Sequence, residues 1–215
     1  IATESESDTH NDSTTLKLIN EQEVKDVTKT FNYKDFNRVD LTGMFSLTVR
    51  QGKSYSIKVT TKGNLFNFIT VKQEGNELII SGNKENYNEK HIPLTVVVSM
   101  PSLRAIETKG MSDIRIIGFN EKNMLINTKW MQSIEGVNNR ITHLLLLAKG
   151  ASNIDLSKSK IVNAKIDLKG ASNANLQMDG GTLSGVIKGI ASLTYSGKVT
   201  TENIFHKGLT SISQS

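Results

Sequence analysis

The sequence KGASNI at residues 149–154 is followed twenty residues later by KGASNA at residues 169–174. The pattern recurs as KGMSDI at residues 109–114, KWMQSI at residues 129–134, KGIASL at residues 188–193 and KGLTSI at residues 207–212. The lysines that begin the six copies are therefore 20, 20, 20, 19 and 19 residues apart. A fixed period of this length is typical of repeat proteins, in which each copy forms one structural unit that stacks on the next.

Apolar and polar residues alternate within each copy, as they do over residues 162–168, and this alternation indicates half-buried β-strands. One copy cannot bury its own apolar face, so we expect successive copies to stack about 4.8 Å apart. We therefore predict an all-β fold in which residues 105–215 form a β-solenoid with rungs of about 20 residues. Gly43 and Gly63 also lie 20 residues apart, so the solenoid can begin earlier, with longer insertions. The predicted inward column is Ile114, Ile134, Ile154, Ala174, Leu193 and Ile212.

Residues 31–104 are also rich in predicted strands, but they lack the regular repeat. We predict a hairpin turn at residues 51–54, a second one at residues 74–76, and a polar loop at residues 82–90. The predicted strands are residues 36–41, 45–50, 55–60, 69–73, 78–81 and 94–100, the last of which is ended by a proline. This segment is therefore expected to be an irregular β-rich part of the same domain.

Residues 1–30 are predicted to be a flexible polar tether. The first fifteen residues hold four acidic residues, no lysine or arginine, and too few apolar side chains to form a core. Residues 16–29 are compatible with either a short helix or an added strand. The chain begins without an initiator methionine or an apolar secretory segment. We interpret the start as a tether left after removal of an export signal, or of a segment ending at a lipidated cysteine; a cloned fragment is the alternative.

Composition excludes several classes of protein. The 215 residues include no cysteine, which excludes a disulfide scaffold, a thiolate metal site and a cysteine nucleophile. The longest apolar run, residues 144–148, is far shorter than the roughly 18 residues of a membrane-spanning helix. The formal net charge of +5 becomes about +9 when the acidic first fifteen residues are set aside, so the repeat-containing part is basic.

Three segments together resemble a known family: FNRVDLTG at residues 36–43, LTVRQG at residues 47–52 and LTVVVSMPSL at residues 94–103. With the Gly-x-Ser corners of the repeat, they are similar to the putative autotransporter adhesin, head GIN domain, family of Bacteroidetes-type bacteria, over roughly residues 31–215. The resemblance implies a right-handed parallel β-helix, similar in shape to pectin lyases. It also implies an exported, often lipid-anchored protein of the outer membrane, cell surface or periplasm, with a role in adhesion. The family's usual Gly-Ser-Gly corners are reduced here to Gly and Ser.

The six lysines that begin the copies are the candidate binding residues, and we call them the lysine row: Lys109, Lys129, Lys149, Lys169, Lys188 and Lys207. Their stems are expected about 5 Å apart along one corner. Neighbouring charges repel by only about 1 kcal/mol in water, and Asp113 and Asp167 are expected to neutralise part of the row. Such a stripe suits an acidic polysaccharide or another polyanion. Lysine is also a suitable residue for an exposed strand edge, duplicated with the repeat. Nucleic acid is not expected, because no aromatic residues interleave the lysines.

Trp130 is the only tryptophan and occupies the corner where the other copies have glycine. If its side chain points outward beside Lys129 and Lys149, it can stack on a sugar ring. If it points inward, it fills a widened corner. The two orientations stay open, and the turn at this corner is in question.

One column suggests catalysis: Arg115, Glu135, Asp155 and Asn175. Two carboxylates about 5 Å apart could act as nucleophile and acid on a glycoside. A solvated charge ladder, in which Arg115 neutralises Glu135, is the interpretation we favour. The four histidines lack the spacing of metal ligands, and no nucleophile elbow or phosphate-binding loop occurs. We therefore predict no enzymatic activity, no metal and no cofactor.

Three functions remain as hypotheses. The preferred one is a non-catalytic surface module, an adhesin that binds a host or bacterial surface glycan or another polyanion. The second is a carbohydrate-active enzyme, and the third is a structural envelope protein that spaces or assembles partners. Membrane contact is expected only through an N-terminal lipid anchor, and self-association into a homo-oligomer is left open.

Overall fold

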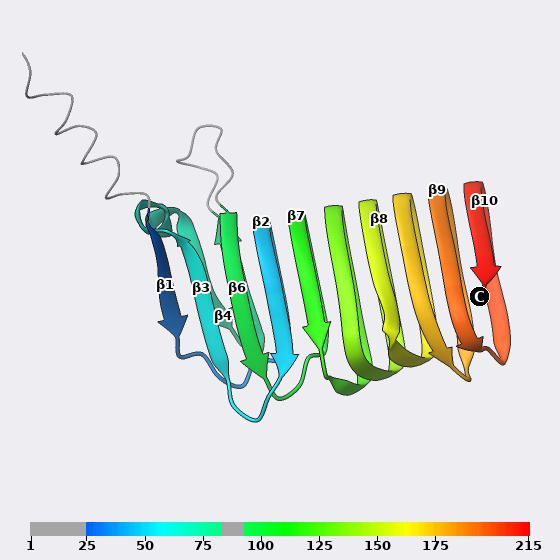
Figure 1. Cartoon of the computed structure of the whole chain (residues 1–215), viewed down its shortest axis with the longest axis horizontal. Helices are drawn as coiled ribbons and strands as arrows, with labels where there is room; N and C mark the ends of the chain where they lie inside the picture. Colours follow the sequence, from blue (N-terminus) through cyan, green and yellow to red (C-terminus); the bar gives the residue numbers. More distant parts are fainter. Residues whose placement is uncertain (1–24, 83–92) are drawn as a thin grey trace, which may run out of the picture.

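The computed structural model describes residues 25–82 and 93–215, and most of these residues lie in β-strands (Figure 1). The strands are β1 (Asp26–Phe31), β2 (Arg38–Gln51), β3 (Ser56–Lys62), β4 (Ile69–Glu74), β5 (Glu77–Gly82), β6 (Pro93–Met100), β7 (Ala105–Ile117), β8 (Asn120–Asp179), β9 (Thr182–Lys198) and β10 (Thr201–Gln214). Within the described residues, the only helical element is a short 3-10 helix, Gly63–Phe68. The predicted all-β class is therefore confirmed.

From β2 onward the strands lie side by side in the order β2-β7-β8-β9-β10 along the long axis of the molecule (Figure 1). They pair in parallel, and from β7 onward the partner positions are one repeat apart: Lys109 pairs with Lys129, and Lys188 pairs with Lys207. Strand β8 is 60 residues long and passes through several neighbouring bands of the sheet, so it holds three copies of the repeat. The predicted superposition of equivalent residues is confirmed for these pairings.

The register extends further toward the N-terminus than residue 105. Gly43 of β2 pairs with Gly110, and Met44 pairs with Met111, so β2 is itself a copy of the repeat. Residues 52–104 form an insertion between this copy and the next. Gly63 begins the 3-10 helix and has no such partner. The early start predicted from the two glycines is therefore right for Gly43 and wrong for Gly63.

Equivalent inward-facing side chains on successive strands lie next to one another and form apolar columns that run across the strands. Ile114, Ile134 and Ile154 are no more than 3% exposed, and Ala174 and Leu193 continue the same buried column. The last member, on β10, is half-buried. Burial alternates along each strand because successive side chains point to opposite faces of a sheet. Each buried isoleucine or leucine contributes roughly 1.5–3 kcal/mol, which holds one copy against the next.

Glycine is favoured at the corners for two separate reasons. Gly150 has a φ of +117°, in the range that side chains disfavour, and a Cβ there would lie 2.3 Å from the carbonyl oxygen of Trp130. Gly170 packs on Gly150 in the same way, with a distance of 2.4 Å from its Cβ position to the carbonyl oxygen below. Trp130 itself has a φ of +88°. The corner that the sequence left in question is therefore formed, with tryptophan in a conformation that favours glycine.

The N-terminal part has a mixed topology, with the strand order β1-β3-β6-β2. Strand β3 pairs antiparallel with both β1 and β6, whereas β6 pairs parallel with β2 over residues 44–51. The hairpin predicted at residues 51–54 is wrong, because β6 lies between β2 and β3. The parallel pairing with β6 satisfies the backbone groups that β2 would have offered to β3.

The other N-terminal predictions have mixed outcomes. Strands β4 and β5 form the predicted antiparallel hairpin around Gly75, and β6 ends where the proline was expected to end it. The predicted tether is wrong for residues 26–30, which belong to β1 and pair with β3. For residues 26–29 the strand alternative is correct. Residues 1–24, and residues 83–90 of the predicted polar loop, lie outside the described residues.

Candidate functional site

The lysine row lies at the corner that precedes each repeated glycine. Pairings place Lys169 beside Lys188 and Lys188 beside Lys207, as they do for the first two members. All six side chains are exposed except Lys169, which is half-buried and donates to Asp167 Oδ2 at 2.7 Å. In the described part of the chain the other five make no ion pair, and neither does Asp113, which was expected to neutralise some of them. Five exposed lysines of the row therefore form no ion pair with a carboxylate of the described residues.

Trp130 lies on this basic edge. Its side chain is 52% exposed, and Lys109 Nζ lies 5.3 Å from the centre of its ring. An ammonium group over an aromatic face is attracted by the ring electrons, by about 0.5–1 kcal/mol at an exposed site. The sequence pointed to Lys129 and Lys149 as neighbours of the ring, and the structure places Lys109 against it. Trp130 therefore presents much of its surface to solvent within the lysine row.

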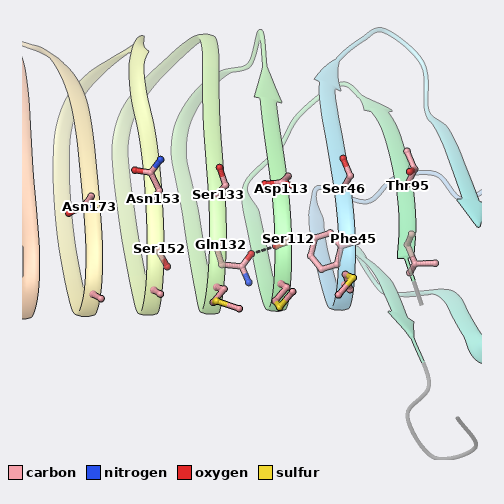
Figure 2. Close-up of a pocket in the computed structure, with 16 residues that line it drawn as sticks. Phe45, Ser46, Thr95, Ser112, Asp113, Gln132, Ser133, Ser152, Asn153 and Asn173 are labelled. Carbon is pink, nitrogen blue, oxygen red and sulfur yellow. Dashed lines mark hydrogen bonds between the residues drawn. The ribbon is translucent and has the colours of Figure 1, made fainter. Parts of the chain in front are cut away.

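A groove of about 670 Å³ lies beside the lysine row and crosses β6, β2, β7 and β8 (Figure 2). Two sets of outward side chains line it. We call the first the methionine–alanine row: Met44, Met111, Met131, Ala151 and Ala171. We call the second the polar ladder: Thr95, Ser46, Asp113, Ser133, Asn153 and Asn173. The ladder residues lie in one line across successive strands in Figure 2.

A buried glutamine supports the floor of this groove. Gln132 Nε2 donates to the carbonyl oxygens of Gly110, at 2.8 Å, and of Lys129, at 3.1 Å. Its Oε1 accepts from the hydroxyl of Ser112. Buried polar groups need such partners, because an unpaired one costs about 1–3 kcal/mol. The bonds tie the corner of β7 to the corner of β8 beneath the methionines.

The groove could not be recognised from the sequence alone. Of the polar ladder, only Asp113 was singled out in the sequence, as a charge expected to neutralise part of the lysine row. The regular recurrence of an apolar residue directly after the corner glycine was an available signal. The wall formed by Leu94 and Thr95 of β6 had none, because β6 joins β2 through a non-local pairing.

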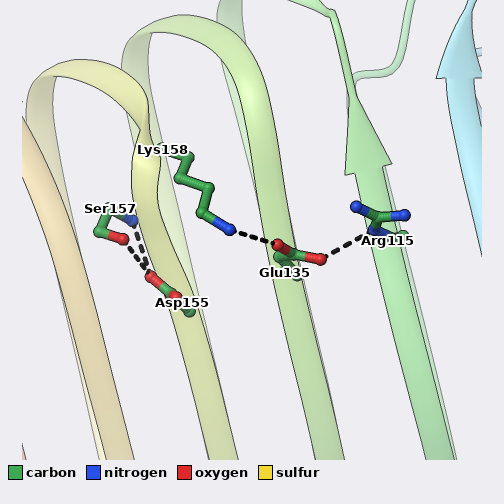
Figure 3. A network of polar contacts seen from close by, with 5 residues as sticks. All are labelled: Arg115, Glu135, Asp155, Ser157 and Lys158. Carbon is green, nitrogen blue, oxygen red and sulfur yellow. Dashed lines mark hydrogen bonds and ion pairs between the residues drawn. The ribbon is translucent and has the colours of Figure 1, made fainter.

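The column that suggested catalysis is a network of charges (Figure 3). Arg115 Nε donates to Glu135 Oε2 at 2.8 Å, and Lys158 Nζ donates to Glu135 Oε1 at 2.9 Å. Asp155 accepts from the hydroxyl of Ser157 at 2.6 Å and from its backbone N–H at 3.0 Å. The favoured interpretation, in which Arg115 neutralises Glu135, is confirmed by this ion pair, and Lys158 adds a second cation.

These contacts favour the ionised form of both carboxyls. Hydrogen bonds from Lys158 and then Arg115 lower the pKa of Glu135 from its ordinary value. The hydroxyl and then the backbone N–H of Ser157 lower the pKa of Asp155. A shallow hollow of about 180 Å³ beside Glu135 is also lined by Arg115. Asp155 does not line this hollow, so the two carboxylates do not share it.

No cluster of three metal-ligating side chains occurs among the residues the structure describes. In that part of the chain, no helix has the length and apolar character needed to cross a lipid bilayer.

The sequence profile described as "putative auto-transporter adhesin, head GIN domain" matches residues 35–215. Among solved structures, the chain is similar to a putative adhesin from Bacteroides fragilis, with a TM-score of 0.66, 16% identity, and coverage of 89% of this chain and 97% of that one. A putative adhesin from Parabacteroides merdae gives a TM-score of 0.56 and 15% identity over 89% and 96% of the two chains. A protein from Parabacteroides distasonis described as a putative lipid binding protein gives 0.52 and 15% over 88% and 96%. At these identities the likeness concerns the fold. No curated protein matches the chain.

Proposed function

This chain belongs to the putative auto-transporter adhesin, head GIN domain, family, and we propose that it is a non-catalytic adhesion module exported to the cell surface. Its ligand in this proposal is an acidic glycan or another polyanion of a host or bacterial surface, bound along the lysine row. Family membership and the adhesin neighbours support the role in adhesion. The charge of the lysine row supports the choice of an acidic ligand.

We also propose that the stacked copies form a right-handed parallel β-helix with rungs of about 20 residues. The parallel pairing of positions 19 or 20 residues apart supports this arrangement, as does the continuous inward column. The arrangement matters for function because a stacked repeat turns each recurring side chain into a straight row.

The observation that carries this function is the set of five ammonium groups that make no ion pair with a described residue. At about 4.8 Å per strand, the six lysine stems span roughly 24 Å. A linear polyanion lying along this edge would contact several ammonium groups at once. The exposed face of Trp130 would lie beside the same ligand and is suited to packing against a sugar ring. Attraction between exposed charges is screened by salt, so binding is expected to weaken as the salt concentration rises.

Binding of heparin and of polygalacturonate, measured by calorimetry at about 0.05 M and 0.5 M NaCl, tests this function. The variant Lys129→Glu/Lys149→Glu reverses two charges of the row, and we expect it to weaken binding about tenfold or more at low salt. The matched control, Lys122→Glu/Lys160→Glu, changes net charge equally at two exposed lysines outside the row. Equal losses in both variants would show that binding depends on the net charge of the protein and not on the lysine row. Absence of binding to both probes would refute the polyanion site.

A carbohydrate-active enzyme remains the alternative that uses Glu135 and Asp155. Hydrolysis by two carboxyls requires one of them to be protonated when the glycosidic bond breaks. Because both pKa values are lowered, neither residue is suited to donate that proton at neutral pH. Release of reducing sugar from a panel of polysaccharides, lost in Glu135→Gln, would overturn the non-catalytic assignment.

We propose an outer-membrane, cell-surface or periplasmic location, with a lipid on an N-terminal segment as the only contact with the membrane. Cell fractionation with radiolabelled palmitate tests both parts. A structural envelope protein would instead assemble without a ligand. Sedimentation velocity, with and without heparin, separates the two functions, because a structural protein would form a homo-oligomer whose size heparin does not change.

A further inference from the structure

We propose a second binding site: the groove beside the lysine row binds an extended neutral glycan chain that lies along the long axis of the molecule. The site uses the methionine–alanine row and the polar ladder, and it needs none of the six lysines. It is therefore independent of the polyanion site proposed above.

The polar ladder supplies one side chain per strand. Ser46 pairs with Thr95 on one side and with Asp113 on the other, and Asp113 pairs with Ser133. The next two members follow at the repeat spacing within β8, so six strand segments contribute to one line (Figure 2). At about 4.8 Å per strand the line is roughly 24 Å long. A ligand along this line meets a new polar group at each strand.

The polar groups of the ladder are available to a ligand. Among the described residues, none forms a hydrogen bond with the side chain of Asp113, Ser133 or Asn153. The amide of Asn153 can donate and accept at the same time, as adjacent hydroxyl groups of a sugar require. Asn173 accepts from Ser192 at 2.6 Å, which leaves its NH₂ group free to donate. Among the residues that the structure describes, Asp113 is the only ionisable one that lines the groove, so the site suits a neutral ligand rather than a polyanion.

The opposite side of the groove is apolar. Met44, Met111 and Met131 lie side by side on paired positions, and the last two are 39% and 52% exposed. Methionine has an adaptable side chain that packs against irregular surfaces. A pyranose ring has an apolar C–H face and a hydroxyl-bearing edge, which match the two sides of the groove. The alanines that continue the row leave room for the ring to approach the corner.

The spacing of the site favours a glycan over a peptide. An extended peptide advances about 3.3 Å per residue, which does not keep step with strands about 4.8 Å apart. The groove also crosses the strands instead of following an edge, so a peptide could not add to the sheet through its backbone. One sugar ring per strand keeps each ring opposite one member of the polar ladder.

Calorimetric titration with four linear neutral hexasaccharides tests the site: cellohexaose, xylohexaose, mannohexaose and maltohexaose. We expect at least one to bind, with a dissociation constant that does not change between low and high salt. The variant Ser133→Ala/Asn153→Ala should weaken that binding about tenfold or more, because it removes two hydrogen-bonding side chains. The matched control, Asn175→Ala/Ser184→Ala, makes the same two changes at positions that do not line the groove.

The polyanion site and the groove are distinguished by the lysine variant. Lys129→Glu/Lys149→Glu should weaken heparin binding about tenfold or more while leaving hexasaccharide binding unchanged. The groove variant should weaken hexasaccharide binding to a similar extent while leaving heparin binding unchanged. Failure of all four hexasaccharides to bind would overturn the groove site without affecting the lysine row. Equal losses in the groove variant and its control would also overturn it, as would hexasaccharide binding that disappears in high salt.

Discussion

The N-terminal part, β1–β6, and the repeat part, β7–β10, belong to one sheet but differ in how their strands pair. In the repeat part each strand pairs in parallel with an equivalent strand, so a residue type that recurs becomes a row on the surface. In the N-terminal part the pairing is mixed, and aromatic residues such as Phe36, Phe45 and Phe66 fill the core. This part covers β2, the first copy, through β5 and β6. The repeat part therefore supplies most members of the candidate binding rows, and the N-terminal part contributes the first members of the groove rows, Met44, Ser46 and Thr95.

The two parts also differ in how they hold their acidic residues. Glu135, in the repeat part, is bound by two cations that lower its pKa. Asp40 lies on β2, where burial and then the nearby charges of Glu77 and Glu107 raise its pKa. Arg38 bridges the two glutamates of that group, at 3.6 Å from Glu77 and 2.6 Å from Glu107. The negative charge of Glu135 is thus compensated within the repeat, whereas that of Asp40 is less well compensated where the irregular part joins the repeat.

The largest expected effect separates a glycine in a stacked corner from one in an open turn. Gly150→Val should destabilise the protein by about 4 kcal/mol, because it adds backbone strain and places a side chain against the carbonyl of Trp130. Gly75→Ala, in the β4–β5 turn, has nothing within 4 Å of the new Cβ and should cost only about 1 kcal/mol. Urea denaturation measures both. Similar losses would mean that stacking does not restrict the corner.

A smaller effect tests whether the two parts unfold together. Ile154→Ala in the repeat part and Ile57→Ala in the N-terminal part should each cost about 3 kcal/mol, since both side chains are buried. Because β2 pairs with both β6 and β7, we expect each variant to shift one common transition. Fluorescence of Trp130 reports on the repeat part, and circular dichroism reports on the whole sheet. Transitions that separate in either variant would show two independent units.

The features predicted from the sequence are those that recur at a fixed spacing. The lysine row and the inward column needed only the period and the alternation of strands, both of which are local. The ion pair of Arg115 with Glu135 followed from the same register, because the two residues are 20 positions apart. In each case the distance in space is set by one strand spacing, so the sequence interval is sufficient.

The features that escaped prediction depend on contacts with no fixed interval. The placement of β6 between β2 and β3 depends on its parallel pairing with β2, which begins at Met44 and Pro93. No repeat in the sequence relates these two segments. The groove needs that placement as well as the bend at each corner. Lys158 reaches Glu135 from a different position in the following copy, so its role was not visible in a column of equivalent residues.

The corner at Trp130 offers a test in which the change restores the pattern of the repeat. Trp130→Gly removes the strain of a side chain at positive φ, but it gives the unfolded chain more freedom and loses the contact with Lys109. These opposing contributions should leave the variant about 0.5–1 kcal/mol more stable than the native protein. Heparin binding should weaken in the same variant. A marked loss of stability in urea denaturation would contradict this prediction. It would show that packing of the ring stabilises the fold, although the side chain is 52% exposed.

The smallest expected effects have opposite signs in the two parts. A carboxyl whose pKa is lowered on folding stabilises the protein at every pH above its pKa in the unfolded chain, which is 4.5 for Glu135. This contribution disappears as the pH falls through the pKa of the folded protein. Glu135→Gln should therefore be destabilising at neutral pH and neutral in strong acid. For Asp40, whose pKa is raised from 3.8, stability decreases as the pH rises from that value through the folded pKa. Asp40→Asn should thus be stabilising at neutral pH and without effect in strong acid.

Both effects should remain small, because the groups are exposed or only partly buried and solvent weakens their interactions. Urea midpoints for the native protein and the two variants, collected from neutral pH to about pH 3, measure them together. The comparison depends on the sign and not on the size. If Asp40→Asn is destabilising at neutral pH, the carboxylate is compensated by its surroundings, most directly by Lys129, whose charge opposes the rise of its pKa. The junction between the irregular part and the repeat would then be as well balanced as the repeat itself.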